Sequence, residues 1–104
     1  MEKVIAVIVT YNRIKLLKEC LNAVLSQTYK VHKIFLIDNA STDGTADLFI
    51  KGGEYDKDVI DYRRMETNLG GAGGFYEGIK ICRDMECDYV WIMDDDTIPY
   101  TDCL

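Results

Sequence analysis

The sequence has few of the residues that cross-link or break a small fold. It contains one proline and one histidine in 104 residues, and its four cysteines include no Cys-x-x-Cys pair. Because structural zinc sites favour closely paired cysteines, reduced thiols are the preferred interpretation over a zinc site built from Cys82, Cys87 and Cys103. The histidine, His32, lies in a predicted loop beside lysines, so we expect it to be solvated and to take no part in acid–base chemistry.

No apolar run is long enough to cross a membrane. The longest, residues 4–9, is far shorter than the about 20 residues that a spanning helix needs. The first residues also lack the charged region and the cleavage site of a secretory signal peptide. We therefore expect a cytoplasmic domain with no membrane span of its own.

Basic residues are outnumbered by acidic ones. Lys and Arg total 12 against 18 Asp and Glu, which gives a formal net charge of -6. Such a chain repels polyphosphate, so nucleic acid is not an expected partner. An anionic small ligand would need local geometry or a bound metal ion to overcome this field. The length leaves room for one domain, residues 1–104, of ordinary globular composition.

Apolar patterns alternate along the chain between those of buried strands and those of amphipathic helices. Strands are predicted at residues 4–9, 33–38, 59–63 and 89–93, and helices at 13–27, 41–51 and 75–86. Ser41 or Thr42 would cap the second helix, and two glycines at 52 and 53 would end it. This order predicts an α/β fold, a three-layer sandwich with a mostly parallel sheet and helices on both faces.

Two of the predicted helices have an apolar stripe that should face the sheet. The helix at 13–27 carries Leu17, Cys20, Leu21, Val24 and Leu25, and the helix at 75–86 carries Phe75, Ile79, Cys82 and Met85.

Polar and glycine residues follow each predicted strand. Ligands of parallel sheets bind outside the carboxyl ends of the strands, so these loops are expected to form one site. The candidates are Thr10, Tyr11, Asn12 and Arg13 after the first strand, Asp38 and Asn39 after the second, Asn68, Gly70 and Gly71 after the third, and Asp94, Asp95 and Asp96 after the fourth.

The three consecutive aspartates indicate a metal site. In extended backbone Asp94 and Asp96 point to one side and Asp95 to the other. Two ionised carboxylates about 5 Å apart repel by roughly 3 kcal/mol at an effective dielectric near 20. A divalent cation removes that repulsion, and hard oxygen ligands suit Mg²⁺ or Mn²⁺. The alternative is a solvated acidic turn.

The glycine-rich segment, residues 68–75, is neither a dinucleotide fingerprint nor a P-loop. Tyr76 stands where the fingerprint needs a third glycine, and no Gly-Lys-Ser/Thr follows. The segment either lets the backbone approach a ligand closely or is a flexible turn. Asp38 is expected to present an exposed carboxylate to sugar hydroxyls or a base N–H, or else to begin a turn. Tyr11 and Arg13 could stack on a base and reach a phosphate.

Four segments in this order resemble the beginning of a family 2 glycosyltransferase of the GT-A fold. They are residues 9–13, 37–45, 68–75 and 91–99, and together they span nearly the whole chain. The glycine-rich segment and the triple aspartate are most similar to the branch of galactofuranosyl- and rhamnosyltransferases. The resemblance implies a Rossmann-like nucleotide-diphospho-sugar transferase fold, of which this chain is the N-terminal half.

The resemblance also implies roles for the candidate residues. The donor would be a UDP- or dTDP-linked sugar, and transfer to a saccharide acceptor would be inverting and metal-assisted. Thr10, Tyr11 and Arg13 would lie around the base, and Asp38 would face the nucleoside. Asn68 and the glycine loop, with Gly70 and Gly71, would border the ribose, diphosphate or donor sugar. Asn12 and Asn39 would also belong to the donor site. Asp94 and Asp96 would hold Mg²⁺ or Mn²⁺, and Asp94 and Asp95 would contact the donor.

No position matches the family's catalytic base, which comes from a later segment and is expected beyond Leu104. Residues 1–104 are therefore expected to be a single donor-binding domain, truncated from a longer enzyme and inactive alone, with the full-length enzyme at the inner face of the membrane. The strand at 89–93 would lie beside the first strand with an uncovered edge, which predicts a homodimer. Two alternatives stay open: a nucleotide-binding remnant without transfer activity, and an Asp-x-Asp phosphatase.

Overall fold

The computed structural model describes residues 3–28, 30–49, 55, 58–85, 87–97 and 99. In chain order the elements are β1 (Val4–Thr10), α1 (Ile14–Leu25), β2 (Lys33–Asp38), the 3₁₀ helix η1 (Thr45–Leu48), β3 (Ile60–Arg64), α2 (Gly70–Arg83) and β4 (Tyr89–Asp94). Each predicted strand is confirmed to within one residue at either end.

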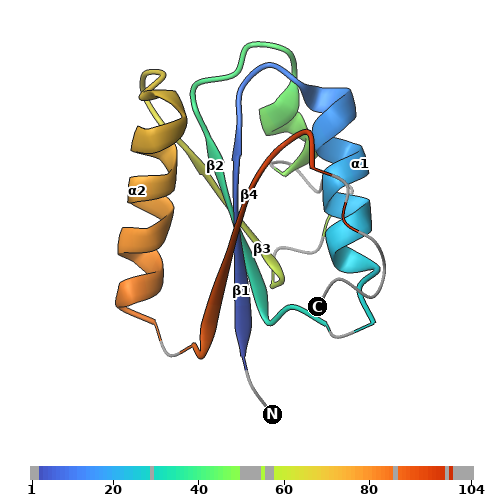
Figure 1. The fold of residues 1–104 in the computed structure, drawn as a ribbon. Helices are drawn as coiled ribbons and strands as arrows, with labels where there is room; N and C mark the ends of the chain where they lie inside the picture. Colours follow the sequence, from blue (N-terminus) through green and yellow to red (C-terminus); the bar gives the residue numbers. More distant parts are fainter. Residues whose placement is uncertain are drawn as a thin grey trace.

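The strands form one parallel sheet in the order β3-β2-β1-β4. Helix α1 and η1 cover one face of the sheet and α2 covers the other, which confirms the three-layer prediction (Figure 1). In the register, Thr10 lies opposite Asp38 of β2, and Val9 lies opposite Asp94 of β4. The polar residues that end neighbouring strands are therefore placed side by side at one edge of the sheet.

Strand β1 runs through the centre of the core. All seven of its residues are buried, as expected for a strand covered on both faces. Ala6 and Ile8 pack in the cluster on the α1 side, whereas Ile5, Val7 and Val9 pack in the cluster on the α2 side. This alternation explains the continuous apolar run in the sequence.

Helix α1 confirms its predicted apolar stripe. Leu17, Cys20, Leu21 and Val24 are buried, and Leu25 is partly buried against the same cluster. The helix is slightly shorter than predicted and ends at Leu25, after which Ser26 donates its backbone N–H to the carbonyl of Asn22.

Helix α2 begins at Gly70, not at Phe75 as predicted. The glycine-rich segment therefore forms the first turns of the helix. A Cβ atom at Gly74 would lie 2.7 Å from Val9 Cγ1, so glycine at this position lets the helix approach the sheet closely. The predicted inward position of Ile79 is wrong, since this side chain is 44% exposed and Gly78 beside it faces the sheet instead.

The second predicted helix is also shorter than expected. It is a 3₁₀ helix that starts at Thr45 after Gly44, with no side-chain cap from Ser41 or Thr42. Ser41 is engaged elsewhere, because its hydroxyl accepts a hydrogen bond from the Asn12 backbone N–H at 2.9 Å. The predicted end at residues 51–53 lies outside the described residues.

Strand β4 lies beside β1, as the resemblance predicts, but it is not buried on both faces. Tyr89, Val90 and Ile92 are exposed, while Met93 packs into the α1-side cluster. In the described part of the chain β4 pairs with β1 alone, so it is an edge strand. None of the described helices is long and apolar enough to cross a membrane.

Candidate functional site

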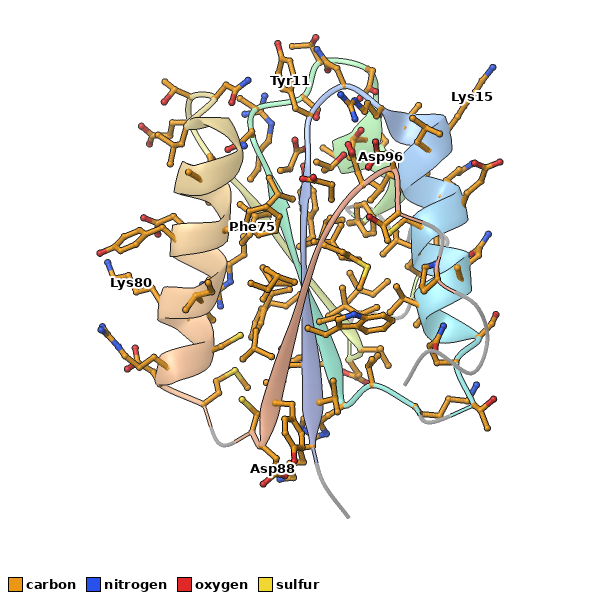
Figure 2. All side chains as sticks on the ribbon, viewed as in Figure 1. Tyr11, Lys15, Phe75, Lys80, Asp88 and Asp96 are labelled. Atoms are coloured by element: carbon orange, nitrogen blue, oxygen red, sulfur yellow. The ribbon has the colours of Figure 1, made fainter. Side chains whose placement is uncertain are left out.

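A cavity of about 280 Å³ opens at the carboxyl end of the sheet. Figure 2 shows Tyr11 and Asp96 at this end and Asp88 at the opposite end. The residues that line the cavity come from the ends of β1, β2 and β4 and from the start of α2: Val9, Thr10, Tyr11, Arg13, Asn39, Asn68, Gly70, Gly71, Asp94 and Asp95. Nine of them are predicted site residues, whereas Asn12, Asp38 and Asp96 do not line the cavity.

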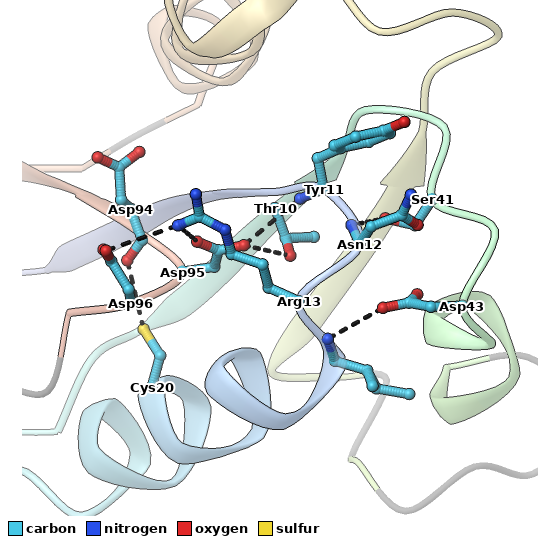
Figure 3. A network of polar contacts seen from close by, with 11 residues as sticks. Thr10, Tyr11, Asn12, Arg13, Cys20, Ser41, Asp43, Asp94, Asp95 and Asp96 are labelled. Carbon is cyan, nitrogen blue, oxygen red and sulfur yellow. Dashed lines mark hydrogen bonds and ion pairs between the residues drawn. The ribbon is translucent and has the colours of Figure 1, made fainter.

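The middle aspartate of the acidic segment, Asp95, is buried, with 4% of its surface exposed. Its Oδ2 accepts hydrogen bonds from the Thr10 hydroxyl at 2.8 Å and from the Tyr11 backbone N–H at 3.4 Å (Figure 3). Its Oδ1 accepts one from Arg13 Nη1 at 3.4 Å. Asp95 therefore ties the end of β4 to the loop after β1.

The two outer aspartates remain exposed. The expectation of extended backbone from Asp94 to Asp96 is wrong, because Thr97 donates its N–H to the Asp94 carbonyl at 3.2 Å and closes a turn. Asp94 lines the cavity. Asp96 lies 3.6 Å from Arg13 Nη1 (Figure 3). The turn buries the middle carboxylate and presents the two outer ones to solvent.

Cys20 lies beneath the acidic turn, a position that the sequence did not reveal beyond its place on an apolar stripe. Its thiol contacts the Asp94 carbonyl and Met93 Sδ, both at 3.8 Å. The pKa of Cys20 is raised to about 12, mainly by burial and to a lesser extent by the charges of Asp95 and Asp96. The thiol stays protonated near neutral pH and is unsuited to be a nucleophile or a metal ligand.

Of the two alternatives predicted for Asp38, the exposed carboxylate is wrong, because the carboxylate is fully buried. Oδ1 accepts a hydrogen bond from the Ser41 N–H at 2.9 Å, and Oδ2 accepts one from the Tyr62 hydroxyl. Sequence reasoning missed Tyr62, which no local motif marks. Burial and the neighbouring Asp38 carboxylate raise the pKa of Tyr62, so its hydroxyl remains a donor.

The two remaining asparagines after β1 and β2 fix the loops around the cavity. Asn12 has a positive φ of 49°, and its Oδ1 accepts a hydrogen bond from the Thr42 N–H at 2.7 Å. Asn39 is buried, and its Nδ2 donates to the Gly70 carbonyl at 3.1 Å. Asn12 thus joins the first two loops, and Asn39 holds the start of α2 against β2.

The start of α2 presents backbone groups at the cavity. Asn68 Oδ1 accepts a hydrogen bond from the Gly70 N–H at 2.8 Å. A Cβ atom at Gly71 would meet nothing within 4 Å, so this position faces open space. A helix N-terminus beside a cavity favours a negatively charged ligand.

The donor set of the acidic turn fits a hard divalent cation. Asp94 and Asp96 supply exposed carboxylate oxygens, the ligand type that Mg²⁺ and Mn²⁺ prefer. Within the described ranges no group of three or more His, Cys, Asp or Glu side chains is arranged to hold a metal. A cation here would complete its coordination with water or ligand oxygens. Of the weaker zinc candidates, Cys103 lies outside the described residues.

Comparison of the sequence with known proteins finds one family along nearly the whole chain. The family described as glycosyl transferase family 2 matches residues 5–104. A galactofuranosyltransferase of Mycolicibacterium smegmatis is 37% identical over 98 residues, which cover 94% of this chain and 31% of that protein. The abequosyltransferase of Salmonella typhimurium is 36% identical over 90 residues, covering 84% of this chain and 26% of that protein. The chain thus spans less than a third of these relatives.

Solved structures share the fold. A mannosyltransferase from Pyrobaculum calidifontis, in complex with GDP-Man and Mn²⁺, superposes with a TM-score of 0.78 at 25% identity, covering 96% of this chain and 29% of that one. Staphylococcus aureus TarS in complex with UDP superposes with a TM-score of 0.79 at 24% identity, with the same coverage of 96% and 29%. These likenesses confirm the predicted GT-A fold.

Proposed function

The chain belongs to glycosyl transferase family 2, and from that premise we propose that its cavity binds a nucleotide-diphospho-sugar. The observation that carries the proposal is the convergence of nine predicted site residues on one cavity at the carboxyl end of the sheet. Ligands of open parallel sheets bind at this edge.

The charges around the cavity suit a diphosphate. Arg13 and the N-terminus of α2, at Gly70 and Gly71, supply positive potential on the cavity wall. Asp94 and Asp96 would hold a divalent cation, either Mg²⁺ or Mn²⁺. Such a cation, when bound, neutralises charge on the departing nucleoside diphosphate. This arrangement would let a chain of net charge -6 hold an anionic donor.

Two of the similar proteins, the galactofuranosyltransferase and the UDP-bound TarS, support a finer proposal for the donor. We propose a UDP- or dTDP-linked donor, a sugar such as galactofuranose or rhamnose, and inverting transfer to a saccharide acceptor by the longer enzyme. No position of the sequence matches the catalytic base that the family resemblance implies. We therefore propose that this chain alone binds the donor and does not transfer the sugar. The family match over residues 5–104 leaves the alternative of an Asp-x-Asp phosphatase without support.

Two further features belong to this proposal. The free thiols of Cys20, Cys82 and Cys87 support a reducing, cytoplasmic location, with the longer enzyme at the inner face of the membrane.

The exposed apolar edge of β4 supports a homodimer of this chain. Light scattering tests the second point, and a monomer at high protein concentration would contradict it.

The experiment that tests donor binding is a thermal-shift panel of UDP-, dTDP- and GDP-linked sugars with and without Mn²⁺. We expect stabilisation that requires both nucleotide and metal, because a ligand that binds only the folded state raises its stability. Asp94→Asn and Asp96→Asn should abolish the shift. Asp84→Asn, which removes an exposed aspartate just after α2, should retain it. No shift with any of these donors would overturn the proposal.

A further inference from the structure

Arg13 connects two of the three consecutive aspartates. Its Nη1 lies 3.4 Å from Asp95 Oδ1 and 3.6 Å from Asp96 Oδ2. Among the described residues that line the cavity, Arg13 is the one with a basic side chain. Arg13 is the last residue of the loop between β1 and α1, so the sheet and the helix together set the position of its backbone.

The two contacts of Arg13 differ in their surroundings. The Asp95 carboxylate is 5% exposed, and its other oxygen is held by Thr10 and by the Tyr11 backbone. The Asp96 side chain is 55% exposed and that of Arg13 is 52% exposed, so water competes for this pair. Exposed ion pairs are weak. The contact with Asp95 therefore anchors the guanidinium, and the contact with Asp96 is the one that a competing cation can break.

We propose that Arg13 is a positioning residue that serves as the internal counter-ion of the acidic turn and competes with a divalent cation for Asp96. A cation that binds Asp94 and Asp96 displaces the guanidinium from Asp96. The guanidinium then remains tethered to Asp95 on the wall of the cavity, where it pairs with the diphosphate. This inference rests on the proposed function, because it takes Asp94 and Asp96 as the cation ligands.

The competition predicts a sign that a merely structural role would not give. If Arg13 only held the turn in shape, its loss would weaken cation binding. If Arg13 competes, a neutral residue at this position tightens binding of the cation by about two- to fivefold, the range of an exposed ion pair. In the wild type a bound cation frees the guanidinium to pair with the diphosphate, so the cation tightens UDP binding. Because coupling between two ligands is reciprocal, UDP then also tightens Mn²⁺ binding. A neutral residue at position 13 removes this contribution, so UDP tightens Mn²⁺ binding by a smaller factor.

The test is a titration of the full chain with MnCl₂, with free Mn²⁺ measured by electron paramagnetic resonance, first without nucleotide and then with UDP. Arg13→Met and Arg13→Gln are the neutral variants, and Arg13→Lys keeps the charge. Lys15→Met is the matched control, because Lys15 is an exposed lysine near the same helix start that points away from the sheet (Figure 2). Circular dichroism verifies that each variant is folded.

We expect both neutral variants to bind Mn²⁺ more tightly than wild type, with Arg13→Lys and Lys15→Met within twofold of wild type. One outcome would overturn the role of Arg13 and leave the proposed cation site intact. In that outcome Asp96→Asn weakens Mn²⁺ binding, but the two neutral variants of Arg13 bind Mn²⁺ no more tightly than Lys15→Met does. Mn²⁺ binding that neither Asp94→Asn nor Asp96→Asn weakens would overturn the proposed cation site itself.

Discussion

The Thr10 hydroxyl donates a 2.8 Å hydrogen bond to Asp95 Oδ2, joining the ends of β1 and β4 across 85 residues of chain. Both side chains are buried, with 1% and 4% of their surfaces exposed. The same carboxylate holds Arg13 at 3.4 Å. One buried carboxylate therefore links the packing of the central strand to the position of the basic side chain in the cavity.

Thr10→Val should destabilise the fold, because it keeps the shape of the side chain and removes the donor to a buried carboxylate. We expect a loss of about 1–3 kcal/mol in the free energy of unfolding, the usual range for a hydrogen bond to a charged group, because Asp95 Oδ2 keeps only the longer bond from the Tyr11 N–H at 3.4 Å. Urea unfolding measures this loss. Thr67→Val, at an exposed threonine, is the control and should change the free energy by less than about 0.5 kcal/mol. Equal effects of the two substitutions would contradict the importance of the Thr10–Asp95 contact.

The order of the elements along the chain and the location of the cavity could be predicted from local patterns, whereas the place of β4 beside β1 was predicted from the family resemblance. Continuous β-branched runs indicate strands buried on two faces, and strand–helix alternation fixes a parallel sheet whose carboxyl ends meet at one edge. The positions of Thr10, Asn39 and Asp94 follow from this topology. That these three residues lie close together could be predicted without knowing any side-chain contact.

Which carboxylates are buried could not be predicted in the same way. The burial of Asp38 depends on Tyr62, which arrives from another strand, and the burial of Asp95 depends on Thr10 and a turn after β4. These are contacts between residues distant in sequence. The early start of α2 was missed because glycine has a low intrinsic helix propensity, which close packing against the sheet overrides at Gly74 and Gly78.

The packing of α2 gives a second prediction. A Cβ atom at Gly78 would collide with Val7 Cγ1, a buried side chain of the central strand. Gly78→Ala should therefore cost about 1–3 kcal/mol, the usual penalty of overpacking a core. Gly71→Ala, where a Cβ atom meets nothing within 4 Å, should be neutral or stabilising, because alanine favours a helix. The melting temperatures of the two variants compare them, and a stable Gly78→Ala protein would contradict the close approach of α2 to β1.

The hydrogen bond from Tyr62 to the buried Asp38 carboxylate gives a third prediction. Tyr62→Phe removes the hydroxyl and keeps the ring, which stacks on Phe49 with centroids 4.9 Å apart. We expect a loss of about 1–3 kcal/mol, because Asp38 loses one of the two donors found for it among the described residues. Tyr76→Phe, at a tyrosine that is 64% exposed, should change the free energy of unfolding by less than about 0.5 kcal/mol. A loss of similar size in both variants would show that the Asp38 contact is not the cause.

The acid side of the stability profile should depend on Asp43, which ties the start of α1 to η1. Its Oδ2 accepts a hydrogen bond from the Ile14 N–H at 3.0 Å, and its Oδ1 accepts one from the Thr45 hydroxyl at 2.6 Å. Burial acts to raise the pKa of Asp43, but the hydrogen bonds from Thr45 and Ile14 outweigh it and lower the pKa below its usual value. Because the folded pKa is below the unfolded one, the ionised carboxylate stabilises the fold above the unfolded pKa, and this contribution is lost as pH falls through the folded pKa.

Asp43→Asn should therefore reduce stability near neutral pH by less than about 1 kcal/mol, since solvent screens this exposed group. Urea unfolding at a series of pH values should show the difference from wild type shrinking toward low pH, relative to Asp84→Asn as the control for net charge. A difference that stays constant or grows as pH falls would contradict the assignment.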